Sequence, residues 1–179
     1  MAKDSEATTG WEPERDLWEF VLALYAQDSV PPLCLQLQED YELDVVLLLF
    51  AVWAGSERLR LSQVTLSALR RATDDWRSHM VLPLRAQRKQ WRDSAVHTRE
   101  YNAAKALEVE AERQQLQLQL SALSETPDSL IPAEPVDVKA DSSQACVREN
   151  LLACLSLYSV DDAAAQSAIE VLFEAAAAI

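Results

Sequence analysis

Two aspartate–histidine pairs have the residue types and spacing that come nearest to acid–base or metal chemistry. Asp75 lies four residues before His79, and Asp93 lies four residues before His97. Residues four apart share one helix face, where a carboxylate can orient an imidazole. A dinuclear carboxylate site would want Glu-xx-His motifs with further inward carboxylates, and these are absent. We expect surface hydrogen bonds or ion pairs here. The alternative is an enzyme with a small-molecule or metal site between core helices, around these four residues.

Glycine is too scarce for the common nucleotide-binding loops. The chain has 2 glycines, Gly10 and Gly55, whereas phosphate-cradling loops need several residues that tolerate positive φ and close backbone approach. No cysteine or serine can be tied to either histidine as a nucleophile. The sequence therefore predicts no catalytic residue and no cofactor, and favours a non-catalytic protein over an enzyme.

A basic stripe stands out in a chain whose net charge is -13. At 100° per residue, Arg85, Arg88, Lys89 and Arg92 fall within an arc of about 100° on one helix face. Residues 57–99 hold ten Lys and Arg against four Asp and Glu, whereas the remainder holds six against twenty-five. The stripe is therefore a candidate binding face for an acidic or phosphorylated protein partner, because the arginine fork suits carboxylate and phosphate.

Two other interpretations of the stripe stay open. In the first, the stripe is a solvated helix face or pairs with the acidic helices of the same chain. In the second, it binds nucleic acid, but the overall acidity opposes a polyanion and no recognised nucleic-acid motif is present. Outside the stripe, Trp11 is a further candidate partner contact, since tryptophan is enriched at interface hot spots; the alternative is that it folds back on the first helix.

Apolar residues at helical spacing predict the first three helices. They predict a helix over residues 13–27 and a short helix that ends near Tyr41. The run VVLLLFAVWA at 45–54 is apolar all round, which on a helix means burial on every side. We expect this central helix to end with Gly55 in the C-cap position.

The remaining elements are also predicted to be helical. Ser62 is suited to cap the next helix, which Pro83 should bend or restart. Strong helix formers predict a helix over 99–124, although QLQLQL within it alternates with a strand's period.

The expected architecture is all-α: a compact multi-helix core followed by a Pro-rich linker and a two-helix hairpin. We expect a flexible tail over 1–12, a helical core domain over 13–123, an acidic Pro-rich linker over 124–143 and a C-terminal hairpin over 144–179. The hairpin must dock on something, either the body of the same chain or a second subunit, so a homo-oligomer through these helices is possible.

The segments LWEFVLALYAQDSVPPLCLQLQEDYELDVVLLLFAVWAG, 17–55, and VLPLRAQRKQW, 81–91, carry a family resemblance. They are similar to a domain-of-unknown-function family of small helical proteins in bacteria. The resemblance extends to about residue 123, and LLLFAVWAG is its most specific part. It implies a bacterial, cytoplasmic, mostly helical protein and adds no catalytic residue.

Cysteine usage and hydropathy point to the same compartment. The 3 cysteines have no CxxC spacing, which is typical of reduced thiols in a cytoplasmic protein. The longest apolar run is far shorter than the roughly 20 residues that span a bilayer, so no membrane segment is expected. These features predict a cytoplasmic protein, and the basic stripe favours a non-catalytic adaptor or accessory role.

Overall fold

The computed structural model describes residues 16–92, 96–125, 130–132, 142–160 and 163–179. In chain order its elements are α1 (Leu17–Tyr25), α2 (Val30–Tyr41), α3 (Val45–Ser56), β1 (Leu59–Leu61), α4 (Gln63–Trp76), the π-helical segment η1 (Arg77–Val81), α5 (Leu82–Trp91), α6 (Thr98–Ser124), β2 (Leu130–Pro132), α7 (Ser142–Leu157) and α8 (Ala163–Ala177). The predicted all-α fold is confirmed, with one short antiparallel strand pair, β1 and β2, added to it. In these ranges no helix is long and apolar enough to cross a membrane.

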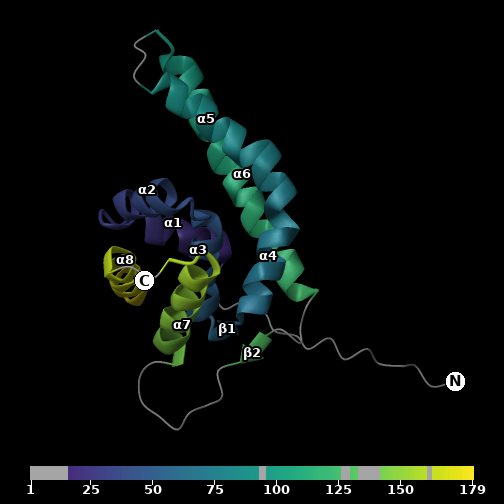
Figure 1. The fold of residues 1–179 in the computed structure, drawn as a ribbon. Helices are drawn as coiled ribbons and strands as arrows, with labels where there is room; N and C mark the ends of the chain where they lie inside the picture. The colour runs from purple at the N-terminus through teal and green to yellow at the C-terminus, as the bar shows by residue number, and fades with distance from the viewer. Residues whose placement is uncertain (1–15, 93–95, 126–129, 133–141, 161–162) are drawn as a thin grey trace, which may run out of the picture.

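A long helical arm projects from a helical body (Figure 1). We call α4, η1, α5 and α6 the arm, and α1, α2, α3, α7 and α8 the body. The base of the arm joins the main hydrophobic core through Leu66, Leu69, Leu116 and Leu123. Beyond that base, α5 and the first half of α6 run side by side away from the body (Figure 1).

Capping fixes the start of α4, and Pro83 does not end the rod that α4 begins. As predicted, the Ser62 hydroxyl accepts a hydrogen bond from a backbone N–H in the first turn, that of Thr65, at 3.0 Å. Further on, the N–H of Leu82 donates to the carbonyl of Arg77, five residues back. A helical proline removes a donor and crowds the carbonyl four residues before it. The wider π turn makes room for the ring, so the rod widens before Pro83 and continues.

α3 runs through the middle of the body. Residues 45–55 are all buried, as their uniformly apolar character predicts. Asp44 caps the helix by accepting the N–H of Val46 at 3.1 Å and that of Leu47 at 3.4 Å. This buried helix is the element on which the other body helices pack.

Gly55 lies inside α3, so the prediction that it forms the C-cap is wrong. α3 ends at Ser56 with Glu57 as its C-cap, and Gly55 does not have a positive φ. A Cβ built at this position would lie 2.5 Å from the Cα of Val147, far inside van der Waals contact. Glycine is required here because the backbone of α7 crosses α3 at this point.

The C-terminal helices α7 and α8 pack on the other helices of the same chain. Val147, Leu151, Cys154 and Leu155 of α7 belong to the hydrophobic core that includes α3, and so do residues of α8. In this fold the apolar face of α7 is therefore occupied by its own chain. The proposed boundaries of the core, linker and hairpin stay a prediction, and most of the linker lies outside the described residues.

Asn150 ties α7 to both α3 and β1. Its side chain is fully buried. Its Oδ1 accepts the N–H of Leu61 at 2.8 Å, and its Nδ2 donates to the carbonyls of Ala51 at 3.0 Å and Leu59 at 2.9 Å. One amide thus satisfies three buried backbone groups, so the position of β1 depends on α7.

Candidate functional site

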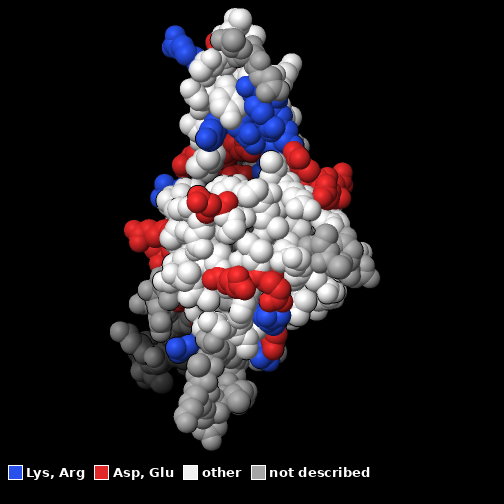
Figure 2. Space-filling view, turned by 90° about the vertical axis from the view of Figure 1, so that its left-hand side faces the viewer, with Lys and Arg blue, Asp and Glu red and all other residues white. Residues whose placement is uncertain are grey.

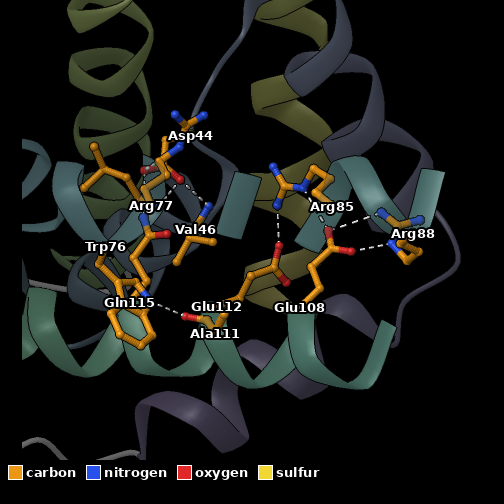
Figure 3. Close-up of polar contacts among 11 residues, drawn as sticks. Asp44, Val46, Trp76, Arg77, Arg85, Arg88, Glu108, Ala111, Glu112 and Gln115 are labelled. Atoms are coloured by element: carbon orange, nitrogen blue, oxygen red, sulfur yellow. Dashed lines mark hydrogen bonds and ion pairs between the residues drawn. The ribbon is translucent and has the colours of Figure 1, made fainter. Parts of the chain in front are cut away.

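Arg85 and Arg88 of the predicted basic stripe form a buried ion cluster with α6 (Figure 3). Arg85 is 7% exposed; its Nε donates to Glu108 Oε1 at 2.8 Å, and its Nη2 pairs with Glu112. Arg88 pairs through Nε with the second oxygen of Glu108, and its Nη2 donates to Oε1 at 3.2 Å. Both guanidinium groups therefore have intramolecular carboxylate partners.

The two carboxyl groups of this cluster have opposite pKa shifts. Burial alone would raise the pKa of Glu108, but hydrogen bonds from Arg88 and Arg85 outweigh it, and the pKa lies below its ordinary value. Burial raises the pKa of Glu112 above its ordinary value despite the charge of Arg85, and the nearby charge of Glu108 adds to the rise. Glu108 is thus held as a carboxylate, whereas Glu112 takes up a proton more readily.

A second polar cluster fixes the base of the arm to the body. Gln115 Nε2 donates to Asp44 Oδ2 at 2.7 Å, and Arg77 Nε lies 3.5 Å from the same oxygen. Trp76 Nε1 donates to the carbonyl of Ala111 at 2.9 Å. Figure 3 shows both clusters along one side of α6. The direction in which the arm leaves the body is therefore set by hydrogen bonds as well as by apolar packing.

The other two residues of the stripe are closer to solvent. Lys89 Nζ pairs with Glu39 Oε1 of α2 at 2.9 Å, with side chains 37% and 47% exposed. A surface pair of this kind is weak and can be exchanged for another carboxylate. Arg92 is exposed just past the end of α5, and it has no ion-pair partner within the described ranges. The structure thus separates the stripe into two cations paired with α6, buried Arg85 and partly buried Arg88, and two more accessible cations, Lys89 and Arg92.

The structure describes three members of the two Asp–His pairs, Asp75, His79 and His97. His79 Nδ1 lies 2.8 Å from the backbone carbonyl of Asp75 in an exposed position, and the ring of His97 stacks on Trp91 with ring centroids 6.1 Å apart. Asp93 lies outside the described residues, and so does Trp11. Among the residues that the structure does describe, no group of three or more His, Cys, Asp or Glu could hold a metal ion.

A cavity of about 360 Å³ lies where the arm leaves the body. Its apolar wall comes from α1, α2 and α3, including Trp18, Cys34 and Val46, and its polar wall comes from the facing side of α5 and α6. The polar wall consists of Arg85, Arg88, Tyr101, Lys105, Glu108 and Glu112. The alternative function placed a site between core helices around the Asp–His pairs, and the lining of this cavity includes none of Asp75, His79 and His97.

The cavity surroundings hold a phenol and a thiol in their neutral forms. Partial burial raises the pKa of Tyr25 to about 12, and the nearly complete burial of Cys34 raises the pKa of its thiol to about 12. A thiolate rather than a thiol is the nucleophile in cysteine chemistry. The arrangement is therefore better suited to binding an apolar group beside a charged wall than to nucleophilic attack.

Sequence reasoning missed Glu108, Glu112 and Lys105. The available signal was spacing, because Arg85 and Arg88 are three apart and the two glutamates are four apart, so each pair presents a single helix face. The apolar wall offered no such signal, since it is contributed by three helices that precede α5 by dozens of residues.

Comparison with known proteins gives one match. Residues 16–119 match a family described as "Protein of unknown function (DUF2390)". This segment includes α1 to α5 and most of α6, and with them both walls of the cavity. No curated protein and no solved structure matched the chain.

Proposed function

We propose that this chain, which belongs to the DUF2390 family of proteins of unknown function, is a non-catalytic adaptor or accessory protein. Because the family has no known function, the proposal is argued from the surface of the chain itself. The proposed partner is an acidic or phosphorylated protein segment that docks on the arm. The observation that carries this proposal is the accessibility of two cations at the end of α5, Lys89 and Arg92. Figure 2 shows Lys and Arg side chains gathered on the projecting part of the molecule.

Exchange of an ion pair provides the mechanism of docking. Among the described residues, Lys89 pairs with the exposed Glu39 alone, and a partner carboxylate or phosphate can take the place of that glutamate. The guanidinium group of Arg92, three residues further on, can form bidentate hydrogen bonds with a carboxylate or a phosphate. Glu39 already has a pKa lowered by its hydrogen bond and charge interaction with Lys89, which indicates that this position favours an anion.

Arg85 and Arg88 contribute indirectly to this function. Their guanidinium groups fix α5 against α6 through Glu108, so they position the helix that carries Lys89 and Arg92. Oligomerisation through the C-terminal helices has less support, because α7 already packs on α3. The proposal places the protein in the bacterial cytoplasm, where its free cysteines would stay reduced.

The proposal is tested by in-cell cross-linking and mass spectrometry with three baits. Wild-type protein is compared with Lys89→Glu/Arg92→Glu, in which both accessible cations are reversed, and with Glu39→Gln, which frees Lys89 from its internal partner. We expect one identified partner to be captured by wild type, lost with the double variant, and captured at least as well by Glu39→Gln. Equal capture by the double variant, with circular dichroism showing it folded, would refute the proposal.

A further inference from the structure

The mouth of the cavity between arm and body is lined by exposed apolar side chains. Leu22 is 49% exposed, Tyr25 43%, Leu35 38% and Val109 40%, and all four line the cavity. They come from α1, α2 and α6, so three helices contribute to one apolar entrance. Apolar side chains gathered at a concave site are typical of a binding site.

The floor of the cavity is apolar and closed. Cys34, Val46, Leu49 and Leu116 line it and are each at most 5% exposed. The volume of about 360 Å³ lies within the range of about 300–1,000 Å³ that is usual for small-molecule sites. A hydrocarbon chain or ring system entering from the mouth would be removed from water over most of its surface.

The opposite wall carries an excess of positive charge. This wall contains three cations, Arg85, Arg88 and Lys105, and two carboxyl groups, those of Glu108 and Glu112. Lys105 is exposed, and within the described part of the chain it has no ion-pair partner. Arg88 directs Nε and Nη2 to Glu108, and its side chain also forms a hydrogen bond with Tyr101 on the same wall. Even with both glutamates ionised, the wall is complementary to one further negative charge.

We propose that this cavity binds an amphiphilic monocarboxylate, with its hydrocarbon chain between α1, α2 and α3 and its carboxylate at Lys105 and Arg88. The inference does not depend on the docking function of Lys89 and Arg92, which lie outside the cavity lining. It assigns the apolar mouth, the closed floor and the charged wall to a single ligand.

The charged wall selects among ligands that share the same chain. A neutral alcohol would bury its chain equally well but would gain no ion pair with Lys105, and an alkylamine would meet a wall on which cations outnumber carboxyl groups. A raised pKa at Glu112, caused first by burial, acts in the same direction, because a protonated Glu112 leaves the wall more positive. The discrimination is therefore electrostatic, while the affinity comes from burial of the chain.

Isothermal titration calorimetry of the full chain with decanoate tests the assignment. Decanol and decylamine are the headgroup controls, and hexanoate and hexadecanoate bracket the chain length. We expect decanoate to bind at one site per chain, and to bind at least about tenfold more tightly than either headgroup control, which corresponds to about 1.4 kcal/mol. The lining variant Lys105→Glu should weaken decanoate binding by about tenfold or more, whereas Lys105→Arg should preserve it.

Two further variants separate the cavity from the rest of the surface. Leu35→Trp fills the mouth and should abolish decanoate binding without lowering the melting temperature, because Leu35 is already 38% exposed. Arg99→Glu reverses an exposed cation on the same helix that does not line the cavity, and it should leave the affinity unchanged. The docking variant Lys89→Glu/Arg92→Glu should also bind decanoate normally, so failure of the docking proposal would not affect this result.

Three outcomes would overturn the inference. The first is the absence of decanoate binding to folded wild-type protein. The second is equal affinity for decanol and decanoate, which would show that the charged wall has no part in binding. The third is affinity that survives Leu35→Trp, which would place the ligand elsewhere. If a cross-linked protein partner is lost with Leu35→Trp while decanoate fails to bind, the cavity receives a partner side chain instead.

Discussion

Replacement of Glu108 by glutamine tests whether the buried ion cluster holds the arm together. Glu108 accepts from Arg85 Nε and from two nitrogens of Arg88, with only 6% of its side chain exposed. Glu108→Gln keeps the shape, removes the charge, and turns an NH₂ group toward guanidinium donors. Both arginines lose their shared carboxylate partner, although Arg85 retains Glu112.

The expected loss of stability follows from that geometry. Removing one member of a buried ion pair costs about 3–5 kcal/mol, since the remaining charge stays buried without compensation. The side chains of Arg88 and Glu112 are 18% and 29% exposed, so water compensates part of the loss. We therefore expect about 3 kcal/mol, the lower end of the range. For a chain of this size the melting temperature would fall by about 6–12 °C.

Urea unfolding followed by circular dichroism measures the effect. The urea concentration at the unfolding midpoint should fall. The slope of the unfolding free energy against urea concentration should stay constant, because the surface exposed on unfolding is unchanged. Glu112→Gln is the matched control. Burial already disfavours the charged form of Glu112, as its raised pKa shows, and Arg85 keeps Glu108, so this variant should lose about 1 kcal/mol or less.

The pH dependence supplies an independent check on the same pair. The pKa of Glu108 is lowered in the folded state, so its stabilising contribution is present above the ordinary value of 4.5 and is lost as pH falls through the folded pKa. The difference in the free energy of unfolding between wild type and Glu108→Gln should therefore become smaller as the pH falls below 4.5 toward the folded-state pKa of Glu108. The contribution of Glu112 to stability changes with pH in the opposite direction, because its pKa is raised: the contribution is lost as the pH rises through that pKa. A loss below about 1 kcal/mol for Glu108→Gln at neutral pH would refute the role assigned to the cluster.

Three further predictions concern the body and its core. Gly55→Ala should lower the free energy of unfolding by about 1–3 kcal/mol in urea titrations despite the better helix propensity of alanine, because the new Cβ would lie 2.5 Å from Val147 Cα. Asn150→Ala should cost about 2–3 kcal/mol in the same assay, since it leaves three buried backbone groups without their partner. Cys34 and Cys154, with pKa values raised by burial to about 12, should react with a disulfide reagent much more slowly in native protein than in urea; equal rates would show that they are accessible.

Local patterns were enough to predict most helices. Burial of residues 45–55 follows from an apolar run without a polar face, and the cap at Ser62 follows from its hydroxyl before an amphipathic segment. The QLQLQL segment is helical because its neighbours favour a helix, yet Gln115 and Gln119 are fully buried. The Gln115 amide donates to Asp44, a residue 71 positions earlier in the chain, and no local periodicity predicts such a partner.

Long-range packing explains what the sequence could not reveal. Gly55 was interpreted through helix-ending rules because the crossing partner, Val147, lies about ninety residues further along the chain. The π turn before Pro83 lets the helical rod continue, whereas the rule for a proline inside a helix predicts only a bend or a restart. The cavity combines walls from α1–α3 and α5–α6, so it could be recognised only after these helices were placed together.

The basic stripe shows why charge counted along a sequence overstates the charge available to a partner. The positive window ends at Arg99, and Glu108 and Glu112, which neutralise Arg85 and Arg88, come after it. Reversing all four cations of the stripe at once would therefore combine two different effects, because the variant would lose the buried cluster as well as the accessible charges. Lost binding would then follow from a displaced α5 as readily as from a missing contact. Reversing only the accessible pair leaves α5 fixed by the buried cluster, so a change in binding in that variant reports on the surface itself.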